Sequence, residues 1–110
     1  MNEQEYAAFV AAGFTKRHEG TEGLMHAAIG IGGESGELLD AVKKTWVYGK
    51  LLDLDNVVEE LGDLEWYMEA LRSLIGVNRE TVIAANVAKL TRRYPVKYTD
   101  ELAVARLDKA

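Results

Sequence analysis

Apolar residues recur at spacings of three and four along most of this chain, and this periodicity constrains the fold more than any other feature of the sequence. Such spacing is typical of helices that bury one face, whereas no stretch keeps the alternation of a strand for long. We therefore expect an all-α protein with a loop over residues 14–23. The expected helices span residues 3–12, 22–46, 55–75 and 79–93.

Residues that commonly begin or end helices support these boundaries. Asp53 or Asp55 is suited to the N-cap of the second long helix, because a carboxylate accepts hydrogen bonds from free backbone N–H groups. Gly76 follows its last turn, where glycine readily adopts the left-handed conformation. Asn78 is suited to cap the next helix, which must end before Pro95.

The composition predicts one small globular domain, residues 1–110, with a hydrophobic fraction of 48%. A net charge of −5 argues against a nucleic-acid partner, and the absence of cysteine excludes disulfides and thiolate metal sites. No apolar run reaches the roughly 18 residues of a membrane span, and no signal peptide is visible. We therefore expect a cytoplasmic protein without a membrane partner, and a homo-oligomer because so small a bundle is thin.

The stretch "GIGGESGEL", residues 30–38, combines glycine with negative charge. Each glycine inside a helix costs roughly 1 kcal/mol relative to alanine, so some other role must offset that cost. A phosphate-binding loop is excluded, since the spacing matches neither known glycine motif, no strand precedes it, and its carboxylates would repel phosphate. The glycines are Gly30, Gly32, Gly33 and Gly36.

On a helix, this region has a polar face and an apolar face. The polar face carries His26, Gly30, Gly33, Glu34, Glu37, Asp40 and Lys44. The apolar stripe carries Leu24, Ala28, Ile31, Leu38, Leu39 and Val42. We expect Gly30 and Gly33 to let a ligand approach the backbone, and Gly32 and Gly36 to let another helix approach. The alternative is that the polar face is simply solvated, as most charged helix faces are.

A second acidic pair lies on the next helix. Glu60 and Asp63 are three residues apart and share a face, which Tyr67 continues one turn later. Two antiparallel helices would bring this pair beside Glu34 and Glu37. Four adjacent carboxylates cannot all stay ionised without cations, and hard oxygen ligands suit Mg²⁺ or Mn²⁺.

A cationic set lies on the following helix. Asn86, Lys89 and Arg93 fall on one face, which suits a polyphosphate if it faces a metal site. A solvated basic face is the alternative interpretation.

These motifs together resemble the all-α nucleoside triphosphate pyrophosphohydrolase superfamily, in particular its MazG-like branch. The likeness rests on Glu34-Ser-Gly-Glu37, then Glu60-Leu-Gly-Asp63, then Asn86-x-x-Lys89-x-x-x-Arg93, and runs over about residues 24–106. The resemblance implies a bundle of four to five helices, assembled as a homodimer or a dimer of dimers (homotetramer). It also implies Mg²⁺-dependent cleavage of a nucleoside triphosphate to the monophosphate and pyrophosphate, as in nucleotide-pool cleaning.

The same resemblance implies roles for single residues. Glu34, Glu37, Glu60 and Asp63 would be catalytic and hold the metals. Lys44, Asn86, Lys89 and Arg93 would contact phosphates, and His26 and Tyr67 would lie near the base or sugar. A water activated by the metals or oriented by Glu34 or Glu37 would attack the α-phosphorus, with the choice between the two glutamates left open.

Two other function classes stay open at this point. One is a non-catalytic helical module whose carboxylates only bind metal or a basic partner. The other is a phosphohydrolase that acts on a different phosphorylated metabolite. The sequence does not identify the preferred base or sugar of the substrate.

Overall fold

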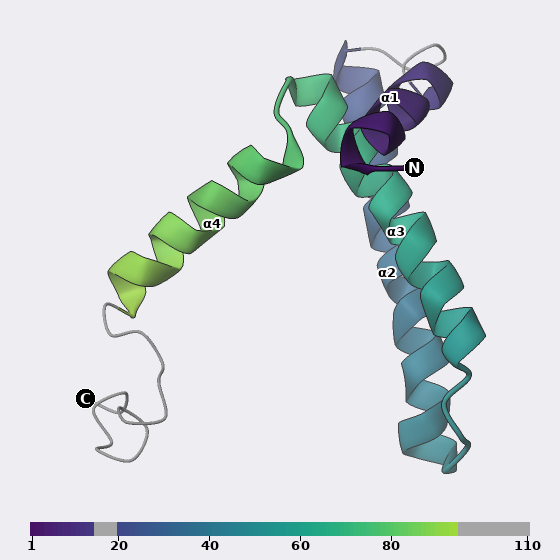
Figure 1. Cartoon of the computed structure of the whole chain (residues 1–110). Coiled ribbons are helices and arrows are strands. Elements are labelled where there is room, and N and C mark those ends of the chain that lie inside the picture. Colours follow the sequence, from purple (N-terminus) through teal and green to yellow (C-terminus); the bar gives the residue numbers. More distant parts are fainter. Residues whose placement is uncertain (15–19, 95–110) are drawn as a thin grey trace. The chain divides into compact units, whose positions relative to one another are not determined.

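The computed structural model describes residues 1–14 and 20–94, and all regular structure in these two ranges is helical. The helices are α1 (Glu3–Phe14), α2 (Gly20–Tyr48), α3 (Leu54–Ile75) and α4 (Arg79–Arg93), as Figure 1 shows. The all-α prediction is confirmed, and each expected helix is present, with α2 extending two residues beyond both expected ends. Of the expected loop, residues 15–19 lie outside the described residues, as does the chain after residue 94, whereas Phe14 belongs to α1 and residues 20–23 to α2.

The chain divides into two compact units. Residues 1–77 form the first, which contains α1, α2 and α3, and α4 belongs to the second. Within the first unit, α2 and α3 lie side by side and α1 packs against α3 (Figure 1). The carboxylate motifs are both in the first unit, so its helix pair determines their geometry.

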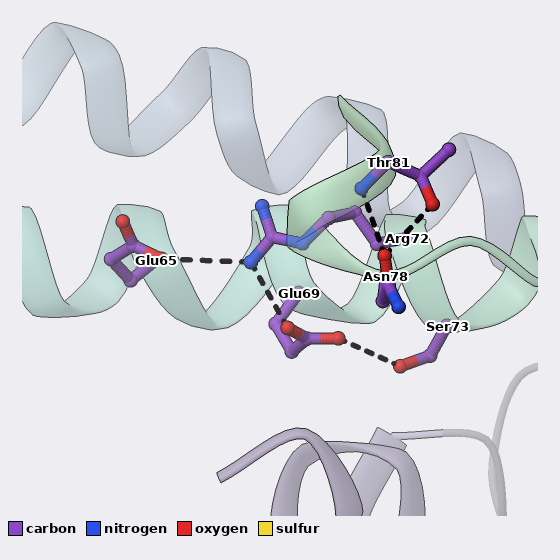
Figure 2. A network of polar contacts seen from close by, with 6 residues as sticks. All are labelled: Glu65, Glu69, Arg72, Ser73, Asn78 and Thr81. Carbon is purple, nitrogen blue, oxygen red and sulfur yellow. Dashed lines mark hydrogen bonds and ion pairs between the residues drawn. The ribbon is translucent and has the colours of Figure 1, made fainter. Parts of the chain in front are cut away.

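The helix termini follow the capping signals in the sequence. Asp53, and not Asp55, is the N-cap of α3, since its side chain accepts a hydrogen bond from the backbone N–H three residues on. Gly76 ends the same helix with φ +74°, a conformation that costs glycine little. Asn78 caps α4 and accepts hydrogen bonds of 2.8 Å from both the backbone N–H and the hydroxyl of Thr81 (Figure 2).

The core of the first unit is small and lies where all three helices meet. Its buried residues are Val10 and Phe14 of α1, Ala27 of α2 and Ala70 of α3. Larger side chains pack around them, namely Tyr6, Trp66, Tyr67, Leu71 and Leu74. Since α1 supplies the two largest buried apolar side chains, this helix completes the core of the unit.

The apolar stripe predicted on α2 is partly wrong. Leu24, Ile31 and Leu38 are half-buried, but the other three members, Ala28, Leu39 and Val42, are exposed in this chain. The fully buried positions of α2 are the small residues Gly23, Ala27 and Ala41. The buried line therefore runs between the two predicted faces, because small residues allow close packing of α2. Glu34 lies on this buried line, so its half-buried side chain faces partly toward the interior.

A second charged cluster follows the acidic motif along α3. The Arg72 guanidinium donates a hydrogen bond to Glu69 at 3.0 Å and lies 3.7 Å from the Glu65 carboxylate (Figure 2). Ser73 donates its hydroxyl to the second oxygen of Glu69 at 3.1 Å. Partial burial, and then the charges of Glu65 and Glu69, raise the pKa of Tyr6. These partners satisfy the buried Glu69 carboxylate, so the cluster has a structural role.

Candidate functional site

Three carboxylates from the two acidic motifs converge between α2 and α3. Glu34 comes from α2, and Glu60 and Asp63 come from α3, one helical turn apart. One oxygen from each lies within 4.8 Å of the other two. Glu34 and Glu60 are half-buried, and Asp63 is exposed. The helix pair therefore brings together residues that are 26 to 29 positions apart in the sequence (60 − 34 and 63 − 34).

The electrostatics of this cluster are those of a crowded anionic site. Partial burial, followed by the charges of Glu34, Glu37 and Asp63, raises the pKa of Glu60 above its ordinary value of 4.5. A hydrogen bond between the Glu60 and Glu34 side chains acts in the same direction. A proton or a cation placed among these carboxylates relieves their mutual repulsion.

Glu37 differs from the other three acidic residues. It is exposed, and it is not part of the group whose oxygens lie within 4.8 Å of one another. Its charge nevertheless acts on Glu60, so it lies near the edge of the cluster. The structure thus brings three of the four predicted carboxylates together and leaves the fourth beside them.

The polar face of α2 continues past the cluster to Asp40 and Lys44. These two exposed side chains form an ion pair, with the ammonium 3.6 Å from a carboxylate oxygen and one helical turn between them. An exposed pair of this kind is weak, so Lys44 can exchange Asp40 for another anion at little cost.

Gly30 accommodates an aromatic ring, and the expectation that it leaves the backbone open to a ligand is wrong. A Cβ atom at this position would lie 2.3 Å from the ring of Tyr67, which is half-buried against α2. At Gly33, as at Gly32 and Gly36, a Cβ would meet no atom of the described residues within 4 Å. Gly33 therefore stays open on the side where a ligand was expected.

His26 lies beside Tyr67, and both rings contact Phe14 of α1. The ring centroids of His26 and Tyr67 are 6.1 Å apart, and those of Phe14 are 5.2 Å from His26 and 6.5 Å from Tyr67. Sequence reasoning found His26 and Tyr67 but missed Phe14. No signal could have found it, because α1 precedes the motifs and its position against them follows only from tertiary packing.

Asn86, Lys89 and Arg93 are exposed on α4, which belongs to the second unit. Their spacing puts them along one side of the helix. The neighbouring side is apolar and also exposed, with Ile83, Val87 and Leu90. α4 is thus an amphipathic helix with adjacent cationic and apolar stripes.

Among the described helices, none combines the length and the apolar character needed to cross a membrane.

Comparison with known proteins gives a family for the chain. A model of the MazG nucleotide pyrophosphohydrolase domain matches residues 24–97, which include both acidic motifs and α4. A curated relative is the Gene 37 protein of Mycobacterium phage L5, which is 36% identical over 81 residues, or 66% of this chain and 67% of the phage protein. No solved structure matches. Helix α1 precedes the matched region. The chain belongs to the MazG nucleotide pyrophosphohydrolase domain family.

Proposed function

We propose that this protein hydrolyses (deoxy)nucleoside triphosphates to the nucleoside monophosphate and pyrophosphate in a reaction that needs Mg²⁺. The observation that carries the proposal is the group of Glu34, Glu60 and Asp63, whose oxygens lie within 4.8 Å of one another inside the family's matched region. Anionic oxygens gathered this closely are suited to hold a divalent cation and, through it, a polyphosphate.

The residues of the cluster fit a divalent cation. They offer only carboxylate oxygens, which Mg²⁺ and Mn²⁺ prefer, and partial burial followed by the charges of neighbouring carboxylates raises the pKa of Glu60. Glu34, Glu60 and Asp63 would hold the ion. When bound, a divalent cation neutralises phosphate charge and makes the phosphorus more electrophilic.

We assign Glu37 to the attacking water. As the carboxylate at the edge of the cluster, it is available to accept a hydrogen bond from water and to take its proton. The water oxygen then forms a bond to the α-phosphorus while the bond from that phosphorus to the α–β bridging oxygen breaks. The bridging oxygen leaves as part of pyrophosphate, and the proton passes from Glu37 to solvent.

Lys89 and Arg93 are proposed to contact the phosphates that leave as pyrophosphate, together with Asn86 and Lys44. Support comes from their positive or hydrogen-bonding side chains and from the family pattern in the sequence. Cationic donors stabilise the charge that develops on the leaving group, which lowers the barrier to bond cleavage. His26 and Tyr67 are proposed to contact the base or sugar.

The protein is proposed to act as a homodimer or homotetramer in the cytoplasm, with nucleotide-pool cleaning as its role. The described part of the first unit leaves many large apolar side chains exposed, which supports burial against a second copy of the chain. On α2 these are Met25, Ile29, Leu39, Val42 and Trp46, and on α3 they are Leu54, Val58 and Leu61.

A panel of canonical and modified nucleoside triphosphates, incubated with the protein and Mg²⁺, tests the proposal. Pyrophosphate and orthophosphate are measured separately, with EDTA in a parallel set of reactions. We expect Mg²⁺-dependent pyrophosphate and equimolar nucleoside monophosphate. Orthophosphate release would instead indicate a different phosphohydrolase, and no release from any member would favour a non-catalytic module.

A further inference from the structure

The N-terminal helix contacts the two residues proposed to meet the nucleoside, although it precedes the region that the family model matches. Phe14, the last residue of α1, is only 4% exposed. Its ring meets that of His26 at an interplanar angle of 64° and that of Tyr67 at 89°, both edge-on contacts. Edge-on aromatic pairs at these separations are attractive and directional, so Phe14 restrains the orientation of both rings.

Gly30, on the neighbouring helix, leaves the space that the ring of the same tyrosine occupies. Three atoms of the Tyr67 ring, Cγ, Cδ1 and Cε1, would lie 2.3 to 2.5 Å from a Cβ at this position. Because Cγ is close to the tyrosine backbone, the ring cannot avoid a methyl group there by moving only its far end. Glycine at position 30 is therefore required for Tyr67 to lie where it does.

The restrained rings are close to the carboxylate cluster along both helices. Gly30 precedes Glu34 by one helical turn, and Tyr67 follows Asp63 by one turn. One turn rises about 5.4 Å along the helix axis. Tyr67 and the glycine that accommodates it therefore lie about one turn along their helices from the carboxylates, next to the place that the phosphates of a bound triphosphate would occupy.

We propose that α1 belongs to the substrate site, with Phe14 and Gly30 as positioning residues that fix Tyr67 and His26 against the nucleoside. This inference rests on the proposed function. It predicts that changes in the packing of these rings weaken substrate binding without slowing the chemical step, because neither residue touches the phosphates.

Steady-state kinetics of Phe14→Leu and Gly30→Ala test this role, with Val10→Ala as the matched control. Val10 is fully buried in the same core and on the same helix. We expect Phe14→Leu and Gly30→Ala to raise KM about three- to tenfold, the equivalent of one lost aromatic contact, with kcat nearly unchanged. Val10→Ala should lower the thermal midpoint and leave KM unchanged. An equal rise of KM in all three variants would overturn the proposal.

A double-mutant cycle with Tyr67→Ala separates positioning from a general effect on the fold. If Gly30→Ala acts by displacing the tyrosine ring, it should raise KM when Tyr67 is present and have no further effect when Tyr67 is replaced. If Gly30→Ala raises KM by the same factor in both backgrounds, it does not act through Tyr67 and the proposal is wrong.

Proton NMR of the His26 ring gives a readout that does not depend on turnover. The chain has only two histidines, so a His18→Gln variant assigns the signals. Phe14→Leu and Gly30→Ala should both shift the His26 resonances, because its neighbouring rings are removed or displaced, whereas Val10→Ala should not. Unshifted resonances in both variants would overturn the positioning role. If instead the shifts occur and no nucleotide is hydrolysed, the proposed function fails and the positioning of the rings stands.

Discussion

Replacing Asp63 by asparagine tests whether the carboxylate cluster is the metal site. The substitution keeps the shape of the side chain and removes one of three charges whose oxygens lie within 4.8 Å of one another. Without metal, the variant should be at least as stable as the wild type, because a repulsive partner is lost. With Mg²⁺, it should gain less stability, because a ligand is lost.

The size of the effect follows from binding linkage. Mg²⁺ at 100 times its dissociation constant stabilises the wild-type protein by about 2.7 kcal/mol, which raises the thermal midpoint of a domain of this size by about 10 °C. Loss of one ligand should weaken binding at least about tenfold, as loss of even an outer-shell partner can do. At the same Mg²⁺ concentration the variant then gains at most about 1.4 kcal/mol, or about half the wild-type shift.

Thermal unfolding followed by circular dichroism measures these shifts, with ionic strength held constant across the Mg²⁺ titration. Glu59→Gln is the matched control, since it removes an exposed carboxylate from the same helix but outside the group. The control should keep the full wild-type rise. Equal Mg²⁺-induced shifts in the wild type, Asp63→Asn and Glu59→Gln would refute the assignment of the cluster as the metal site.

Three further predictions concern the proposed chemistry. Glu37→Gln should lower kcat about 100-fold or more, the usual loss for a general base, and should keep the Mg²⁺-induced rise in thermal midpoint. Loss of that rise would show that Glu37 is a metal ligand instead. Lys89→Ala and Arg93→Ala should each lower kcat/KM on triphosphates about 10- to 150-fold, the equivalent of one charge-assisted contact, and the control Arg92→Ala should not. The raised pKa of Glu60 means that the folded, metal-free protein holds this proton more tightly than the unfolded chain. The stabilisation that this proton gives to the folded protein is therefore fully present below the pKa of Glu60 in the unfolded chain. It is lost as the pH rises through the pKa of Glu60 in the folded protein, which lies above 4.5. Mg²⁺ affinity, measured by calorimetry, should rise over the same interval, and a pH-independent affinity would contradict this.

Local signals in the sequence were sufficient to predict where the helices begin and end. Asn78, Asp53 and Gly76 act through their own side chain or backbone conformation, so their effect does not depend on distant residues. The proximity of Glu34 and Glu60 could also be predicted. Each belongs to a pair of acidic residues one helical turn apart, and the two helices that carry these pairs are joined by a short connection.

Features that depend on tertiary packing could not be predicted from the sequence. Periodicity defines an apolar stripe on α2 but not which line along it meets α3, so the exposure of Leu39 and Val42 was missed. Gly30 signalled a close approach, but only the structure identifies Tyr67 as the group that approaches. The buried pair of Glu69 and Arg72 was also missed, because charges three residues apart on a helix usually face solvent.

Hydrolysis in ¹⁸O-labelled water tests the central proposal most directly, because it identifies the phosphorus atom that water attacks. The purified protein is incubated with Mg²⁺ and the triphosphate that it hydrolyses fastest, and the products are analysed by mass spectrometry. The proposed function predicts one ¹⁸O atom in the nucleoside monophosphate and none in pyrophosphate. Label in pyrophosphate would place the attack on the β-phosphorus, and labelled orthophosphate together with a nucleoside diphosphate would place it on the γ-phosphorus; either result would contradict the account.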